Sequence, residues 1–587
     1  MTLPAAPQSL PLEIAAALLG ERDPARLAAF VGEPRSEVEL RCAALALPSE
    51  DADRLVSHWL TRAGAPAAVH VDRAVATLAG AGELAAAARL AVRHGRRSTQ
   101  RLLLSAHGWA LLLSATRAVM DTLFESVLAD AEPLDDALHG LHLLWLVEAR
   151  RLPHEAARRL RARPLADAGV QALVESRCAQ MFDAPVEALR YADGAVGLLP
   201  EGEHPAASLA LFARGFARLE AGWPEAALDD LGLALRGATR DGHRLLQIDA
   251  LHVLARAHDE RGDDAACGAS LARALSLAAQ AGVQQLPALD SLRRLAAWRA
   301  LRDRLLGGTQ ATGALTEAVP WGHAFPARVL QGAQALLDGR WADLRDLVEA
   351  LQQEQEQSFL PLKWRAEFGW LRLARAARAG LPWRGTGGQP ADPATLAGLQ
   401  LRLLDAAGLG AMSEAALADD LSRRGLRRLA ARLKFIGALA DGDEAGLLAW
   451  WLDPAHDPLD ALWLAPRALP ALERLRHAPG LGSDAEAPLR LAALLKALAG
   501  PALDVVGAAA LPSNVSELTA REWEVLRLIA ADFTNEQIAT RLGVSVVTIK
   551  THINRGYAKL AVATRAQAAQ RVRTLLACAG MAATIPA

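Results

Sequence analysis

The chain has 587 residues, of which 52% are hydrophobic and only 4% aromatic, and its formal net charge is −2. This length exceeds what a single hydrophobic core serves, so several domains or a repeat array are expected. The abundance of Ala and Leu favours closely packed helices and argues against β-sandwiches, which use β-branched and aromatic residues.

The cysteines and apolar runs give no sign of disulfides, metal or membrane. The four cysteines are scattered, without a CxxC pair or a nearby histidine cluster, so we expect no disulfide framework and no metal site, as in a reducing cytoplasm. No basic segment precedes the first apolar stretch, which Glu13 interrupts, so no signal peptide is expected. Charges or prolines break every long apolar run, which argues against a membrane span.

Residues 1–130 are predicted to form an N-terminal helical region. No GxxxxGK[ST] motif occurs along the chain; the nearest pattern, Gly308 to Gly313, continues with Ala314 and Leu315. The lysine and hydroxyl that bind phosphate and Mg²⁺ in such loops are therefore missing. With no nucleophile elbow or metal-ligand spacing either, we expect neither an enzyme nor a bound cofactor.

Residues 131–499 are predicted to form helical repeats. The segment GWPEAAL at 222–228 recurs loosely forty residues later as GDDAA, and an earlier copy, PVEAL, begins 39 residues before Pro224. A later copy, DGRWA, occupies 338–342. Each unit has the pattern of a helix, a glycine turn and a second helix. One such hairpin cannot bury its apolar face alone, so neighbouring hairpins are expected to stack.

These units resemble tetratricopeptide repeats with the lengthened period found in MalT-like regulators. Upstream, residues 70–74 and 80–88 resemble the helical segment that follows the ATPase module in those large regulators. The resemblance implies an all-α superhelix whose concave surface receives a small effector or a protein partner. The alternative is an irregular helical domain with two chance repeats. Residues 500–516 are predicted to be a linker, which could equally include a last short helix.

The C-terminal end is basic while the rest of the chain is acidic. Between Glu517 and Arg573 nine Lys and Arg face five Asp and Glu, a net charge of +4, which leaves −6 for the remainder. No acidic residue follows Glu536. A basic end attracts phosphate, whereas an acidic body is less suited to binding nucleic acid nonspecifically. A solvated basic tail is the alternative explanation.

Helix signals divide this end of the chain into four helices. Three of the predicted helices begin with an S/T-x-x-E/Q capping box, formed by Thr519 with Glu522, Thr534 with Gln537, and Thr564 with Gln567. Gly543 is placed to end the second helix, Val544 to enter the core, and Ser545 to cap the third. This tight connection predicts a helix-turn-helix.

The third helix has one apolar and one polar face. Ile549, Ile553, Gly556 and Leu560 are predicted to face inward, while Lys550, Thr551, Asn554 and Ala558 face outward. Thr548 stands where the other helices have Glu or Gln. An acid there would repel phosphate, whereas backbone N–H groups and a hydroxyl attract it. This pattern suits insertion into a DNA major groove.

The motifs LTARE (518–522), TNEQIA (534–539), SVVTIKTH (545–552), YAKL (557–560) and RAQA (565–568) resemble the LuxR/GerE-type helix-turn-helix. The predicted domain covers residues 517–579. The resemblance implies that bases are read by Lys550, Thr551 and Asn554. It implies that phosphates are bound by Thr534, Asn535, Ser545, Thr548, Lys559 and Arg565. In this family the fourth helix pairs two domains on a palindromic site, so the implied dimer contacts are Val572, Leu575 and Leu576; packing within their own domain is the alternative for each.

Three residues depart from the family pattern. Asp532 and Ala561 replace glycines that usually end helices, and Gly556 stands where the buried face of the third helix usually has Ile. A helix-interior Gly costs about 1 kcal/mol against Ala, and a missing core side chain roughly 2–5 kcal/mol more unless neighbours fill the space. We therefore expect a less stable domain that depends on DNA or dimerisation for order.

The sequence thus predicts a cytoplasmic transcription regulator that binds double-stranded DNA as a homodimer, with no cofactor and no membrane association. A helical-repeat body would sense an effector or protein partner and control the C-terminal DNA-binding domain. The alternative is a protein-interaction scaffold with a weak or vestigial DNA-binding domain, suggested by Gly556.

Overall fold

In the part of the chain that the computed structural model describes, all regular secondary structure is helical. No β-strand occurs among these residues, and the predicted all-α fold is therefore confirmed. The described residues are 12–20, 23–33, 35, 38–39, 49–63, 65–114, 117–129, 133–148, 150–200, 202, 204–283, 286–308, 324–357, 360–379, 383, 385, 392, 394–409, 415–499, 520–530, 533–542, 544–560, 562, 564–565, 567–569 and 572.

Contacts divide the chain into two compact units, residues 1–292 and 293–587. The first unit includes the helices α1 (Leu12–Leu19), α2 (Pro24–Val31), α4 (Ser49–Ala63), α5 (Ala65–Gly80), α6 (Leu84–His94), α7 (Arg97–Leu112) and α8 (Arg117–Leu128), followed within the predicted repeat region by α9 (Asp136–Glu148) and α10 (Pro153–Ala162). Helix α7 packs against α9, so helix packing continues across residue 130. The domain boundary at that residue stays a prediction.

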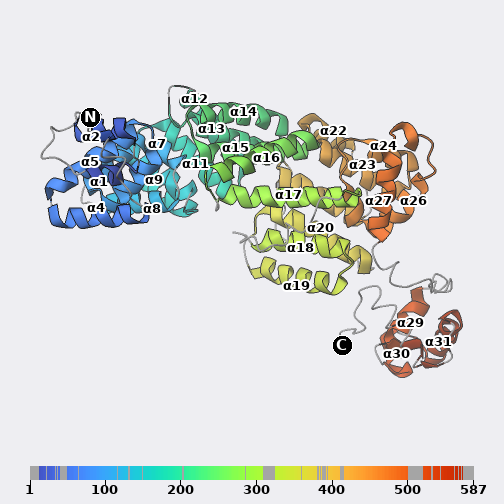
Figure 1. Cartoon of the computed structure of the whole chain (residues 1–587). Coiled ribbons are helices and arrows are strands. Elements are labelled where there is room, and N and C mark those ends of the chain that lie inside the picture. Colours follow the sequence, from blue (N-terminus) through green and yellow to red (C-terminus); the bar gives the residue numbers. More distant parts are fainter. Residues whose placement is uncertain are drawn as a thin grey trace. The chain divides into compact units, whose positions relative to one another are not determined.

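The predicted repeats form consecutive helical hairpins in the first unit (Figure 1). Their helices are α11 (Ala168–Met181), α12 (Pro185–Leu198), α13 (Ala207–Glu220), α14 (Pro224–Arg240), α15 (Arg244–Glu260) and α16 (Asp264–Gln280). Each of these six helices packs against its neighbour within the series, from α11 with α12 to α15 with α16. Helices begin at Pro185 and Pro224, where the sequence copies predicted them.

Glycines with positive φ make the turns of this repeat. Gly222, Gly242, Gly262 and Gly282 recur every 20 residues with φ between 65° and 79°. At Gly222 the turn is closed by the Trp223 N–H, which donates to the Arg218 carbonyl at 2.8 Å. This is the six-residue bond of a helix end with a left-handed residue. The forty-residue sequence period therefore consists of two helix-and-turn units of equal length.

Small side chains let the repeat helices approach closely. Ala227 and Ala234 on α14 are fully buried, and a β-carbon added to Gly215 on α13 would lie 2.7 Å from Leu231 Cγ. Close packing of this kind is dense and intolerant of added volume. The Ala-rich composition thus serves hairpin packing.

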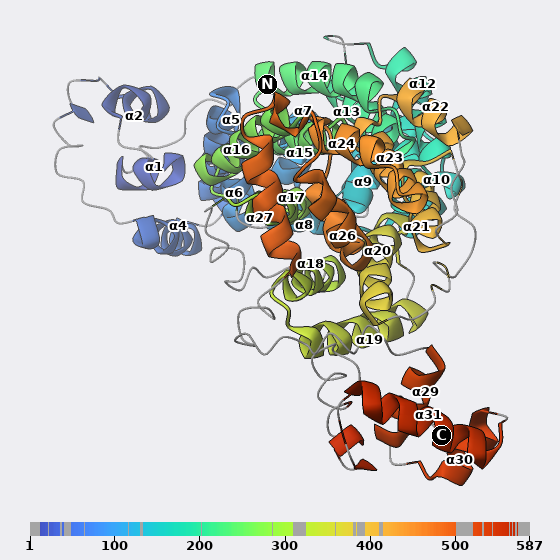
Figure 2. The ribbon, with the colours of Figure 1, turned by 90° about the vertical axis from the view of Figure 1, so that its right-hand side faces the viewer.

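The second unit continues the helical architecture. Its helices before the C-terminal domain are α17 (Pro287–Leu305), within which the unit boundary falls, α18 (Ala324–Leu337), α19 (Trp341–Gln357), α20 (Leu362–Ala379), α21 (Leu396–Leu409), α22 (Ala415–Arg424), α23 (Arg427–Asp441), α24 (Glu444–Leu452), α25 (Pro458–Trp463), α26 (Ala465–Leu475), the 3₁₀ helix η2 (Leu481–Ser483) and α27 (Ala487–Ala499). Helices α18, α19 and α20 pack together (Figure 2). Gly339, with φ of 70°, forms the turn before Trp341, where the later sequence copy predicted a helix start.

A charged cluster is buried in the second unit. The guanidinium of Arg302 on α17 donates to both carboxylate oxygens of Asp457 at 3.1 and 3.0 Å. Arg432 on α23 donates to Asp460 Oδ1 on α25 at 2.5 Å, and Arg428 Nη1 lies 3.7 Å from Asp457 Oδ2. Both aspartates are almost fully buried. The cluster therefore joins α17, α23 and α25.

No helix among the described residues is long and apolar enough to cross a membrane. The predicted linker at residues 500–516 lies outside the part of the chain that the structure describes.

Candidate nucleic-acid interface

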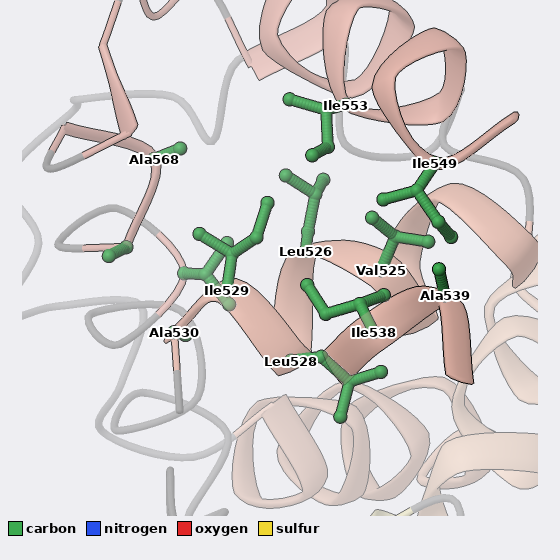
Figure 3. Packing of buried hydrophobic residues seen from close by; sticks show 12 residues of the cluster. Val525, Leu526, Leu528, Ile529, Ala530, Ile538, Ala539, Ile549, Ile553 and Ala568 are labelled. Carbon is green, nitrogen blue, oxygen red and sulfur yellow. The ribbon is translucent and has the colours of Figure 1, made fainter. Parts of the chain in front are cut away.

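The C-terminal domain has a hydrophobic core of its own, built from α29 (Ala520–Ala530), α30 (Asn535–Leu542) and α31 (Val546–Leu560). Leu526 and Ile529 of α29 meet Ile538 of α30 and Ile553 of α31 in this core (Figure 3). Leu542 and Val544 pack against it, and for Val544 the sequence predicted this. The core holds α31 in place and leaves its other face to solvent.

Capping boxes begin two of the helices, as predicted. At α30 the Thr534 N–H donates to Gln537 Oε1 at 2.8 Å, and the Gln537 N–H donates to Thr534 Oγ1 at 3.3 Å. The same reciprocal pair joins Thr564 and Gln567, with both bonds at 3.2 Å. Thr519, predicted to cap α29, and Gly543, predicted to end α30, lie outside the described residues.

Helix α31 begins with hydroxyl groups and without an acid. The Thr548 N–H donates to Ser545 Oγ at 3.1 Å, and the two hydroxyl oxygens lie 2.8 Å apart. Both residues are exposed, and the first turn contains no acidic residue. The positive end of the helix dipole is therefore open to an anion such as phosphate.

The two faces of α31 are arranged as the sequence predicted. Ile549 and Ile553 are buried in the domain core. The residues expected to read bases, Lys550, Thr551 and Asn554, are all exposed on the other side. Their exposure makes them available to a ligand, while their roles in base reading stay predictions.

Residues predicted to bind phosphate also join the fourth helix to α30. Arg565 Nη1 donates to Asn535 Oδ1 at 2.9 Å, and Arg565 Nη2 donates to the Phe533 carbonyl. Thr534, beside Asn535, is exposed. Arg565 and Asn535 are therefore held together on one surface. A phosphate bound by Arg565 would share its guanidinium with Asn535 and the Phe533 carbonyl.

Lys559 has a structural partner that the sequence did not reveal. Its Nζ lies 2.7 Å from Glu522 Oε2, which joins α31 to α29. The side chain of Lys559 is 28% exposed, whereas that of Glu522 is only 3% exposed. The sequence predicted Lys559 as a phosphate contact and Glu522 as a capping residue. The structure uses both to close the core, and the phosphate role of Lys559 stays a prediction.

Arg521 is a second structural cation that sequence reasoning missed. Its Nη2 donates to the Leu542 carbonyl at 2.8 Å, at the last residue of α30, and its Nη1 donates to Glu524 Oε2 at 2.8 Å. A cation at a helix C-terminus satisfies a carbonyl and opposes the negative end of the dipole. The two residues lie 21 positions apart, so no local pattern predicts the contact.

Glu536 places a negative charge on the same side as the predicted DNA contacts. Two hydrogen bonds lower the pKa of Glu536. The larger effect comes from its own backbone N–H, and the smaller from the Thr534 hydroxyl. The positive charges of Lys550 and Arg565 lower this pKa further. The carboxylate is therefore ionised at neutral pH and partly offsets those two cations.

Val572, one of the predicted dimer contacts, is fully buried in the core of its own domain. It therefore has no exposed surface to offer a second copy, and packing within the domain was the alternative that the sequence left open. Leu575 and Leu576 lie outside the described residues.

The gap expected at Gly556 is filled by a neighbour. A β-carbon at this position would lie 2.9 Å from Leu526 Cδ1 and 3.2 Å from its Cγ, and Leu526 is fully buried. The structure therefore corrects the expectation of a missing core side chain, because Leu526 occupies the space that Ile would need.

Residues 516–572 match the family described as bacterial regulatory proteins, luxR family (GerE). The HTH-type transcriptional regulator MalT of Yersinia pestis (strain Pestoides F) is 51% identical over 63 residues, which are 11% of this chain and 7% of that protein. MalT of Serratia proteamaculans (strain 568) is 50% identical over 70 residues, 12% of this chain and 8% of that protein. These matches cover under a tenth of the length of either relative. The C-terminal segment is thus a LuxR-family helix-turn-helix domain similar to that of MalT, and the helical body is consistent with a repeat body.

Proposed function

Because the C-terminal segment is a LuxR-family helix-turn-helix domain, we propose that this chain is a transcription regulator that binds double-stranded DNA in the cytoplasm. The observation that carries the proposal is the outer face of α31. It begins with exposed hydroxyls and no acid, and it presents Lys550, Thr551 and Asn554 opposite a buried isoleucine face. Its N-terminal end would face phosphates while its side chains reach base edges in the major groove.

The domain is proposed to bind as a homodimer to two half-sites. Because Val572 is buried in its own core, the proposed pairing surface is the chain that follows it, including Leu575 and Leu576. A symmetric dimer would read a palindrome with half-sites about one helical turn apart.

Selection of duplexes from a random pool with the whole protein tests both proposals. We expect enrichment of a palindromic sequence and a complex containing two protein copies, measured by light scattering. Lys550→Ala should reduce the enrichment strongly, while Lys434→Ala, which removes an exposed lysine from the body, should leave it unchanged. Failure of the wild-type protein to enrich any sequence would contradict DNA reading and favour the scaffold alternative.

The helical body is proposed to sense a small effector or a protein partner and to control the DNA-binding domain. Stacked hairpins offer a long continuous surface suited to such ligands, and a signal would act by shifting a population of DNA-binding states. If the body restrains the domain, the full chain and a fragment of residues 510–587 should differ in affinity for the enriched duplex. Equal affinities at all protein concentrations would contradict control by the body.

A further inference from the structure

Val547 presents an apolar side chain to solvent at the start of α31. Its exposed fraction, 74%, is the highest among the bulky hydrophobic side chains of the described residues. The adjacent Val546 is half-buried and packs against the domain core. An isolated exposed hydrophobic residue is common in proteins, so the significance of Val547 depends on where it lies.

Val547 lies on the face that carries the proposed base readers. Lys550 and Thr551 follow it by three and four residues, and Asn554 follows by seven, so all four project from one side of α31. The opposite side holds the buried Ile549 and Ile553. Val547 is therefore a bulky apolar side chain beside the polar and basic side chains of Lys550, Thr551 and Asn554.

A hydrogen bond fixes the side chain next to Val547. Thr551 Oγ1 donates to the Val547 carbonyl at 3.1 Å, which commits the hydroxyl hydrogen to the backbone and selects the side-chain rotamer. Valine has one strongly preferred χ1 rotamer in a helix. Both side chains are therefore stiff, and a contact with them would cost less conformational entropy than a contact with Lys550.

Stiff apolar groups on a DNA-reading face have one apolar counterpart in the major groove. Among the base pairs, only those with thymine carry a methyl group there, while the other groups at the base edges are hydrogen-bond donors and acceptors. We propose that Val547, supported by Thr551, is a specificity-determining residue that contacts a thymine 5-methyl group. This inference rests on the proposed DNA-binding function.

Replacement of thymine by deoxyuridine, which lacks only the 5-methyl group, tests the contact. The whole protein is titrated with duplexes enriched from a random pool, in which each thymine is replaced singly. We expect at least one replacement to weaken wild-type binding about fourfold, the value for one buried methyl group. Val547→Ala should bind the thymine duplex at least as weakly as the wild-type protein binds the duplex with the sensitive deoxyuridine. This variant should bind the thymine and deoxyuridine duplexes with equal affinity. Leu489→Ala, which truncates a residue of similar exposure in the body, should retain the wild-type preference.

Two results would overturn the inference. One is that no single deoxyuridine weakens wild-type binding. The other is that replacing thymine by deoxyuridine at the sensitive position lowers the affinity of Val547→Ala by the same factor as that of the wild-type protein. Both leave DNA binding itself intact. If the wild-type protein enriches no duplex at all, the proposed function and the inference fail together. Unchanged circular dichroism of Val547→Ala would show that altered binding does not come from unfolding.

Discussion

Lys559 stabilises the fold of the DNA-binding domain. Its ammonium group lies 2.7 Å from Glu522, whose side chain is almost completely buried. A buried carboxylate that loses its cation still bears the cost of desolvation, so removing one partner destabilises more than removing both. The same lysine was predicted from the sequence as a phosphate contact, and the two roles can be separated by experiment.

We predict that Lys559→Ala lowers the free energy of unfolding of the domain by about 2–4 kcal/mol. Amide hydrogen exchange of α29 and α31 in the full chain measures this loss. The double variant Glu522→Gln/Lys559→Met should recover most of the stability, since it leaves no buried charge. If the double variant is as unstable as Lys559→Ala, the ion pair does not explain the effect. Weaker DNA binding by the stable double variant would support a phosphate contact.

Gly556 shows how a structure can reverse a prediction made from sequence. The sequence predicts that Ile at this position would add stability, but Leu526 already occupies the space. We now predict that Gly556→Ile lowers the free energy of unfolding by about 1–3 kcal/mol through overpacking. Gly556→Ala should have a smaller effect, because its gain in helix propensity offsets part of the crowding. Exchange rates of α31 amides measure both, and slower exchange in the Ile variant would contradict the packing found here.

Among the elements, the repeat hairpins depend on glycine turns. Gly242 has φ of 70° with nothing within 4 Å of an added β-carbon, so a substitution there tests the backbone conformation alone. Gly242→Ala should cost about 1–2 kcal/mol. Gly197→Ala is the matched control, because Gly197 is exposed within α12 with equally open space. It should stabilise by up to about 1 kcal/mol. Urea denaturation of the full chain measures both, and equal effects would show that the turn needs no glycine.

Local patterns predicted the elements well and their partners poorly. The capping boxes at Thr534 and Thr564, the helix starts at Pro185 and Pro224, and the two faces of α31 all depend on residues within one or two turns of each other. Contacts such as that of Arg521 with the Leu542 carbonyl depend on where separate helices pack. No spacing rule connects such residues, so these contacts required the structure.

The largest feature that the sequence did not predict is the buried charged cluster of the second unit. Burial alone would raise the pKa of Asp457, but three guanidinium groups outweigh it and hold this pKa well below its usual range; they belong to Arg302, Arg428 and Arg432. For Asp460, burial dominates over the opposing charge of Arg432 and raises the pKa to about 7. Ionisation of Asp457 therefore stabilises the folded state, whereas ionisation of Asp460 destabilises it.

The raised pKa of Asp460 predicts a pH dependence of stability. A carboxyl group that holds its proton more tightly when folded stabilises fully below the unfolded pKa, near 3.9, and this contribution is lost as pH rises through about 7. Asp460→Asn should therefore gain stability relative to the wild type between pH 5 and pH 8, on the order of 2 kcal/mol. Asp457→Asn should be destabilised at both pH values by about 3–5 kcal/mol, because it leaves the arginines without that charge. Urea denaturation at the two pH values measures both, and an Asp460→Asn difference that does not change with pH would contradict the assignment.

Across the whole molecule, the small C-terminal domain has a net positive charge and the body has a net negative charge. Charge of this kind attracts any DNA through its phosphates, in a salt-dependent and sequence-independent way. Reading of sequence must come in addition, from the outer face of α31. These two contributions can be measured separately.

The affinity of the full chain for an enriched duplex and for a scrambled duplex, measured over a range of salt concentrations, tests base reading by α31 most directly. We predict that Lys550→Ala weakens binding to the enriched duplex by about tenfold or more, the value for a good base contact. Its effect on the scrambled duplex should be much smaller, and both should retain a steep salt dependence. Equal affinity of the wild-type protein for the two duplexes, or an equal loss on both in Lys550→Ala, would contradict base reading by this helix.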